Sequence, residues 1–323
     1  MAKKRVAFDL LSNGISSKWV YLAIPLVLSG FTHLWNPIGF PSIHIDETHY
    51  MRRAMLVMKN LGPYDPYYQY DHPFFGQIFL AGALGLIGYP HSLNPSPNLH
   101  SIEMLYIVPR ILMGLLAVLD TFLVYKIAEY RHGRNVALFS SVIFAVMPLS
   151  WLLRRILLDS ILLPFLLASI LLAIYIKRRK NLHDVHTNDN NSSSSSIKIP
   201  IILLSGILLG LAIYTKIPAF TMIPLVGFLV YTNSNKSLKA LGLWFLPVIL
   251  IPAMWPVYSI SAGQFDDWKE GILHQVNRTG ISMLASAKAV FQIDPVIMVM
   301  GISGIILSVI KNKYFILIFY ISK

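Results

Sequence analysis

Long apolar blocks recur along the whole chain, and they constrain its fold more than any other feature. Most are about 17 to 23 residues long, the length at which an α-helix crosses a hydrocarbon layer of about 30 Å. They lie at residues 19–38, 74–90, 105–127, 136–153, 156–176, 199–217, 219–232, 240–260 and 295–310. The sequence therefore predicts an all-α fold, a polytopic bundle of transmembrane helices.

Composition supports a membrane protein and excludes other classes. Hydrophobic residues make up 55% of the chain and charged residues only 13%, whereas soluble domains carry roughly 25% charged residues. The net charge is +12, but the basic residues form short clusters between apolar blocks, as topology signals do, so no nucleic-acid partner is expected. The chain has no cysteine, which excludes disulfides and thiolate metal sites.

The glycine-rich block at residues 74–90 decides the predicted topology. If it dips into the bilayer and returns to the same side, more Lys and Arg residues fall on the cytoplasmic side than if it crosses. We therefore expect a re-entrant or interfacial segment and a cytoplasmic N-terminus in a multi-pass protein of the cell membrane. Outer loops are then expected at about 41–104 and 261–294, and a cytoplasmic linker at about 177–198.

The whole chain, residues 1–323, is expected to form one transmembrane module. The amphipathic segment 265–278 is expected to lie at the membrane surface, either as a cover over a site or as a solvated helix. The last apolar block, from Tyr314, has about half the length of a span. The natural protein is therefore expected to continue beyond it.

The first candidate site lies on the predicted outer side, where most acidic residues fall. Asp46, Glu47, His49 and Tyr50 follow the first apolar block, and the pair Asp71-His72 precedes the 74–90 block. The simpler interpretation makes Asp46 a helix cap beside solvated charges. Two carboxylates and a histidine held at a bilayer surface instead favour a general-base site.

Basic residues near the predicted outer ends of the spans form the second candidate site. They are Arg110, Arg155 and Lys216, with Asp159 as a local acidic neighbour. An arginine fork or a lysine point charge at such a depth suits a lipid-linked phosphate. The alternative is that these side chains only extend toward the headgroups. Asp120, deeper in its block, is interpreted as a structural polar contact.

Taken in order, these residues resemble a known class of membrane enzymes. The match comprises Asp46-Glu47 with His49-Tyr50, Gly62-Pro63-Tyr64-Asp65-Pro66, Asp71-His72-Pro73-Phe74, Arg110, Pro148 before Arg155 and Asp159-Ser160, and Gly206 to Gly210 before Thr215-Lys216. This order is similar to that of the GT-C class glycosyltransferases, specifically the protein O-mannosyltransferase and aminoarabinose-transferase-like superfamily. Phe74 stands where that family usually has a second proline. The resemblance implies a GT-C type helix bundle with interfacial helices in its outer loops.

The resemblance also implies a reaction. The donor is expected to be a sugar on a polyprenyl phosphate, and the acceptor a protein, lipid or glycan outside the cytoplasm. Asp46 is expected to act as the base of an inverting displacement, and Glu47 beside it is expected to pair with Arg52 or Arg53 as a positioning residue. Arg110, Arg155 and Lys216 are expected to bind the donor phosphate. The sugar or acceptor is expected to be oriented by Asp71, His72, Asp159, His49 and Tyr50.

No cofactor is required by this reaction, although Asp46, Asp71 and His72 have the ligand types that a divalent metal accepts. Two other functions stay open at this point. A transporter or lipid flippase would use buried charges near mid-membrane, and only Asp120 approaches that pattern. A non-catalytic membrane subunit would keep the fold and tolerate the loss of Asp46.

Overall fold

The computed structural model describes residues 15–65, 70–176, 199–277 and 283–311. Within these ranges all regular secondary structure is helical, which confirms the predicted all-α class. The α-helices are α2 (Ile15–Leu34), α3 (Ile45–Met58), α4 (Phe75–Gly85), α5 (Leu99–His132), α6 (Arg134–Val146), α7 (Leu158–Tyr175), α8 (Ile199–Thr215), α9 (Ile223–Asn233), α10 (Leu238–Ser261), α11 (Phe265–Asn277), α12 (Met283–Ile293) and α13 (Pro295–Lys311). Short 3-10 helices occur at η1 (His91–Leu93), η2 (Pro148–Arg154) and η4 (Ile217–Met222).

Several of these helices have the properties of membrane spans. Among the described residues, α5, α7 and α10 are long and apolar enough to cross a membrane, and up to five segments qualify if each bent helix pair is one span. One bent pair is α6 with η2, at an angle of 64°. The apolar helices α2, α4, α8 and η4 with α9 are shorter. The predicted multi-pass arrangement therefore has a structural basis, whereas the N-terminal segment and the linker 177–198 lie outside the described residues.

The helix α4 is the part of the 74–90 block that forms regular structure. It has 11 residues, so it rises roughly 17 Å, about half of a hydrocarbon layer. Its residue Gly76 is closely packed, because a Cβ there would meet the side chains of Leu158, at the start of α7, and Thr215, at the end of α8. The length of α4 agrees with the prediction that this block does not cross, while its sidedness stays a prediction.

Local sequence signals set where several helices begin and turn. The Asn98 side chain accepts a hydrogen bond from the Ser101 N–H at 2.8 Å and so caps α5. Ser237 caps α10 in the same way, with the Ala240 N–H as donor at 3.2 Å. Gly133 separates α5 from α6 with φ of +87°, a conformation that a residue without a Cβ adopts at no steric cost.

Small residues hold α7, α8 and α10 close together. The Ser169 hydroxyl of α7 donates to the Ser205 carbonyl of α8 at 2.8 Å, and the Ser205 hydroxyl donates back to the Ser169 carbonyl at 3.0 Å. On its other side, α8 presents Gly206 and Gly210 to the α10 backbone, where a Cβ would meet the carbonyls of Trp244 and Pro247. Such residues allow membrane helices to pack tightly, so α7, α8 and α10 form a closely packed part of the bundle.

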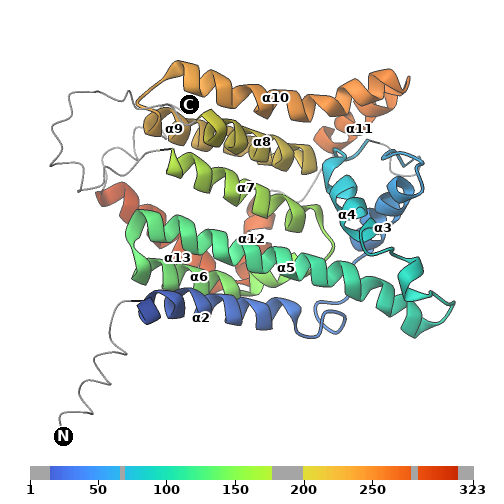
Figure 1. Cartoon of the computed structure of the whole chain (residues 1–323), viewed down its shortest axis with the longest axis horizontal. Coiled ribbons are helices and arrows are strands. Elements are labelled where there is room, and N and C mark those ends of the chain that lie inside the picture. The colour runs from blue at the N-terminus through green and yellow to red at the C-terminus, as the bar shows by residue number, and fades with distance from the viewer. Residues whose placement is uncertain (1–14, 66–69, 177–198, 278–282, 312–323) are drawn as a thin grey trace, which may run out of the picture.

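Segments from both predicted outer loops meet at one end of this bundle. Figure 1 shows α3, α4 and α11 together at that end, next to the long helix α5. Because Lys216, after α8, forms an ion pair with Asp159, in the first turn of α7, the antiparallel helices α7 and α8 also meet there. Their other ends, which flank the linker 177–198, therefore lie at the opposite end of the bundle.

Candidate functional site

Glu47 lies at the centre of a buried polar cluster. It is the third residue of α3, which is capped by His44, and its Oε1 accepts the His44 backbone N–H at 2.8 Å. Its Oε2 accepts the backbone N–H of Ile156 at 3.1 Å, across 109 positions of the chain. The side chain is 0% exposed. Glu47 thus joins the start of α3 to the segment that leads into α7.

Arg110 neutralises Glu47 through two parallel contacts. Its Nε donates to Oε2 at 2.9 Å and its Nη2 to Oε1 at 2.6 Å, a bidentate geometry. Its Nη1 donates to the carbonyls of Pro37 at 2.6 Å and Pro41 at 2.7 Å. Because Arg110 is also 0% exposed, this geometry gives no support to the phosphate-binding role predicted for it. Its observed contacts are structural.

The arginines of α3 have other partners than the one predicted. Arg52 Nε lies 3.1 Å from Asp65 Oδ2, and Arg53 Nη2 lies 2.7 Å from Asp71 Oδ1. The expected pairing of Glu47 with Arg52 or Arg53 is therefore wrong, since Arg110 holds Glu47. The two observed pairs instead tie α3 to the loop that precedes α4.

Asp46 points away from this buried cluster, although it is next to Glu47 in sequence. Its side chain is 48% exposed, and its Oδ2 lies 3.5 Å from His44 Nδ1. It belongs to the first turn of α3, where the exposed backbone N–H groups favour a carboxylate. His49, further along α3, is partly exposed. Asp46 is thus the accessible acid of the pair.

Tyr50 connects Asp46 to the other acidic residues of the site. Burial raises the pKa of its hydroxyl, and the nearby carboxylates of Asp46, Asp71 and Asp159 raise it further. Carboxylates from α3, the loop before α4 and the start of α7 therefore all act on the pKa of this hydroxyl. The phenol stays protonated and available as a hydrogen-bond donor.

His72 lies beside Tyr50, with 6.4 Å between the ring centroids. Burial lowers the pKa of its imidazole; Lys216 and Arg53 lower it further, whereas Asp71 and Asp159 oppose them. The imidazole is thus kept neutral at the point where α3 approaches the ends of α7 and α8. Of the predicted residues, the structure pairs Asp159 with Lys216 and sets His72 beside Tyr50.

Asp159 and Lys216 form an open ion pair at the edge of this group. Lys216 Nζ lies 3.0 Å from Oδ1 and 2.7 Å from Oδ2 of Asp159. The lysine side chain is 28% exposed and the aspartate side chain 54% exposed. Gly76 of α4 packs directly beneath, against Leu158 and Thr215. The pair is therefore accessible from outside but positioned by close packing below it.

The two arginines before α7 differ in their contacts. Arg154 is buried and donates from Nη2 to the carbonyls of Trp35 and Asn36. Arg155 is partly exposed, and its buried Nε has no hydrogen-bond partner within the described ranges. Arg154 Nε is equally without a hydrogen-bond partner in the described part of the chain, so the two arginines differ in exposure, and Arg155 is the more accessible.

Two tyrosines of the loop before α4 join this loop to the α11 region, a contact not anticipated from the sequence. Tyr64 donates to Asp267 Oδ2 at 3.1 Å, and Tyr70 donates to Gln264 Oε1 at 2.7 Å. At Gly271 a Cβ would lie 2.6 Å from the Tyr70 carbonyl oxygen. α11 thus packs against the loop that precedes α4, while its predicted place at the membrane surface stays a prediction. A glycine in an amphipathic helix is the signal that marked this close approach.

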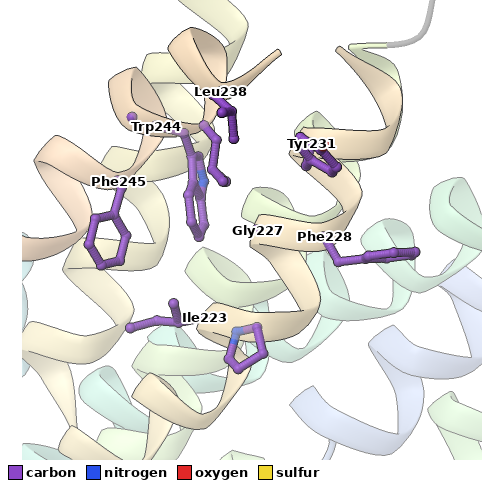
Figure 2. A pocket seen from close by; sticks show the side chains of 10 residues that line it. Ile223, Gly227, Phe228, Tyr231, Leu238, Trp244 and Phe245 are labelled. Carbon is purple, nitrogen blue, oxygen red and sulfur yellow. The ribbon is translucent and has the colours of Figure 1, made fainter. Parts of the chain in front are cut away.

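Two features lie apart from the charged group. An apolar cavity of about 550 Å³ separates α9 from α10, and Figure 2 shows Trp244 and Tyr231 on its walls. Asp120 is fully buried in α5, and neither carboxylate oxygen has a hydrogen-bond partner in the described part of the chain. The polar contact predicted for Asp120 is therefore not observed. No group of three acidic or histidine side chains able to hold a metal ion occurs among the described residues.

Comparisons with known proteins bear on this arrangement. The family model of dolichyl-phosphate-mannose-protein mannosyltransferases matches residues 65–257. Curated protein sequences gave no match. A solved structure, the S. cerevisiae protein O-mannosyltransferase Pmt1-Pmt2 complex bound to the sugar donor, is similar with a TM-score of 0.53 and 19% identity. The similarity covers 81% of this chain and 36% of that chain, so the fold is shared over about a third of the yeast chain. The chain belongs to the dolichyl-phosphate-mannose-protein mannosyltransferase family.

Proposed function

We propose that the chain is a glycosyltransferase that moves mannose from dolichyl phosphate to a hydroxyl group of a protein acceptor. The family match and the fold similarity support this class of donor and acceptor. The observation that carries the proposal is the exposed Asp159–Lys216 ion pair together with the exposed carboxylate of Asp46, which lies on the same helix as Tyr50, the neighbour of His72.

Asp46 is the base in this proposal. Its exposed carboxylate takes the proton from the acceptor hydroxyl as the oxygen attacks the anomeric carbon of mannose. The bond between that carbon and the phosphate oxygen breaks, and its electron pair leaves with dolichyl phosphate. One base is enough for this single inverting displacement. No step requires a metal ion, and the proposed reaction is metal-independent.

The leaving phosphate is stabilised by Lys216 and Arg155. Lys216 is partly exposed and points into the group that contains His72, and Arg155 has donor capacity in reserve. Positive groups that are already in place when negative charge develops on the phosphate stabilise the transition state. Such electrostatic stabilisation is usually a large part of the rate enhancement. Arg110 serves indirectly, because it holds Glu47 and so the turn of α3 that carries Asp46.

The sugar or the acceptor is oriented by neutral and acidic side chains between the base, Asp46, and the phosphate-binding residues. Tyr50 supplies a hydroxyl donor and His72 a neutral imidazole. Asp71 forms an ion pair with Arg53, which fixes the loop that carries His72. His49 lies on the same helix as Tyr50 and belongs to this group by position. The dolichyl tail stays in the bilayer while the headgroup reaches the outer surface.

The decisive experiment compares the wild type with Asp46→Asn in mannose transfer from dolichyl phosphate mannose to a serine- and threonine-containing peptide. Loss of a general base is expected to lower kcat by about 10²- to 10⁴-fold. Asp266→Asn is the matched control, because Asp266 is an exposed acid in the first turn of α11. An Asp46→Asn protein that inserts normally and transfers mannose at the rate of the wild type would falsify the role of Asp46.

The sidedness of the site can be tested separately. The chain has no cysteine, so Ser96→Cys and Ser193→Cys each introduce the single thiol of their protein. A membrane-impermeant thiol reagent applied from outside is expected to label the first variant and not the second. Labelling of both from one side would contradict the proposed outer location of the site.

A further inference from the structure

The ammonium group of Lys216 already forms an ion pair with a carboxylate of the protein. Lys216 contacts both oxygens of Asp159, at 3.0 and 2.7 Å. An arriving phosphate presents oxygens of the same kind to the same ammonium group. It therefore competes with Asp159 for the donors of Lys216.

The other cations of this group are engaged more deeply. Arg110 is fully buried against Glu47 and two carbonyls, and Arg53 is 2% exposed and paired with Asp71. Arg154 is buried against the carbonyls of Trp35 and Asn36. Apart from Arg155, Lys216 is thus the cation of this group that a ligand reaches without breaking buried contacts.

We propose that Asp159 is an internal stand-in for the donor phosphate, which holds Lys216 in place while the site is empty and yields it when the phosphate binds. This inference rests on the proposed function and adds a means of regulating the same site. Asp159 is then a positioning residue that weakens donor and product binding, rather than a group that helps to bind the phosphate.

Two features keep the free-energy cost of separating Lys216 from Asp159 low. Asp159 is 54% exposed, so water solvates its carboxylate as soon as Lys216 turns away. It also lies in the first turn of α7, where the residue before the helix, Leu157, gives no side-chain cap, and a carboxylate near uncapped N–H groups is favoured. The carboxylate therefore remains stable without its lysine.

The stand-in has a consequence for product release. After transfer, dolichyl phosphate leaves with its charge still next to Lys216. Asp159, held close by, competes for the ammonium group and shortens the lifetime of the product complex. Removing the charge of Asp159 should therefore tighten the binding of donor and of product together.

The test is a double-mutant cycle of Asp159→Asn and Lys216→Met. The measurements are KM for dolichyl phosphate mannose and direct binding of dolichyl phosphate to the protein in nanodiscs. Asp159→Asn is expected to lower both KM and the Kd of dolichyl phosphate about threefold to tenfold. In the Lys216→Met background the same change is expected to leave both constants nearly unaltered.

Controls separate this effect from general charge and from misfolding. Glu270→Gln removes one negative charge from the exposed surface of α11, and it is expected to change neither constant. Asp159→Ser provides a second neutral variant, and thermal unfolding verifies that each protein is folded. A higher KM and Kd in both Asp159 variants would overturn the inference, because Asp159 would then help to bind the phosphate.

The binding measurement keeps the inference and the proposed function distinguishable. A wild type that binds dolichyl phosphate, and binds it more tightly after Asp159→Asn, supports the stand-in even if no mannose is transferred, which would defeat the proposed reaction. A wild type that transfers mannose but shows weaker binding after Asp159→Asn supports the reaction and overturns the stand-in. Absence of dolichyl phosphate binding overturns the inference.

Discussion

Two ion pairs at the same end of the bundle differ in almost everything that surrounds them. Glu47 and Arg110 are both 0% exposed and are joined by two hydrogen bonds. Asp159 and Lys216 are joined just as closely, but their side chains are 54% and 28% exposed. The buried pair has backbone partners in two further segments, residues 37–44 and the segment before α7, whereas the open pair is accessible to solvent. Proximity of opposite charges therefore does not identify a binding site, and accessibility separates the two roles.

The largest expected effect comes from breaking the buried pair. Glu47→Gln leaves the Arg110 charge buried without a countercharge, and loss of one partner of such a pair typically costs about 3–5 kcal/mol. Unfolding of the purified protein in mixed micelles should show this loss. Replacing both residues, as Glu47→Gln with Arg110→Met, should recover part of it. If Glu47→Gln alone were as stable as the wild type, the buried pair would contribute no more to stability than the exposed pair does.

A smaller effect is expected beneath the open pair, at Gly76. A Cβ there meets the side chains of Leu158 and Thr215, and overpacking of this kind typically costs about 1–3 kcal/mol. Gly76→Ala should lower the thermal stability and raise KM for the donor, because Asp159 and Lys216 follow those two residues in sequence. Gly82→Ala is the control, since no atom lies within 4 Å of a Cβ at that position. Equal behaviour of the two variants would contradict the packing argument.

The open pair itself should contribute little to stability. Exposed ion pairs are typically worth about 0–1 kcal/mol, so Lys216→Met should unfold within that range of the wild type while donor KM rises. The contrast with Glu47→Gln in the same unfolding assay sharpens the comparison directly. A loss as large as that of the buried pair would make Lys216 a structural residue.

The smallest effect is a pH dependence from His72, whose ring lies beside that of Tyr50. Its pKa in the folded protein is below 6.5, so the unfolded chain binds more protons than the folded one as the pH falls past that value. Stability from His72 is therefore complete above about pH 6.5 and declines below it. His72→Gln should flatten the thermal stability profile between pH 7 and pH 5, whereas His91→Gln, at an exposed position, should not.

The fold class followed from the sequence because one physical requirement, the length of an apolar helix, sets it. Most of the apolar blocks correspond to helices or helix pairs in the structure. The block from Tyr314 and the linker 177–198 fall outside the described residues and stay predictions. The length of α4 agrees with the non-crossing block, because an 11-residue helix does not span a bilayer.

Parts of the candidate site followed from the sequence, but the roles of its residues did not. Asp46, His72, Asp159 and Lys216 were expected at one surface, and the structure pairs Asp159 with Lys216, while the functions of all four stay predictions. The roles of Glu47 and Arg110 were not predictable, because adjacent helical residues point about 100° apart and sequence does not tell which of two neighbouring acids faces inward. The partner of Glu47 lies 63 positions away, beyond any local pattern.

The contacts of Glu47 also constrain when the site can exist. Its partners are His44, Arg110 and Ile156, so the turn that carries Asp46 is complete only after α3, α5 and the segment before α7 have met. A nascent chain still emerging from the ribosome has no such turn until residue 156 has been made and inserted. Assembly of the bundle and formation of this turn are thus coupled, and a partly inserted chain does not yet hold Asp46, the proposed base, in place.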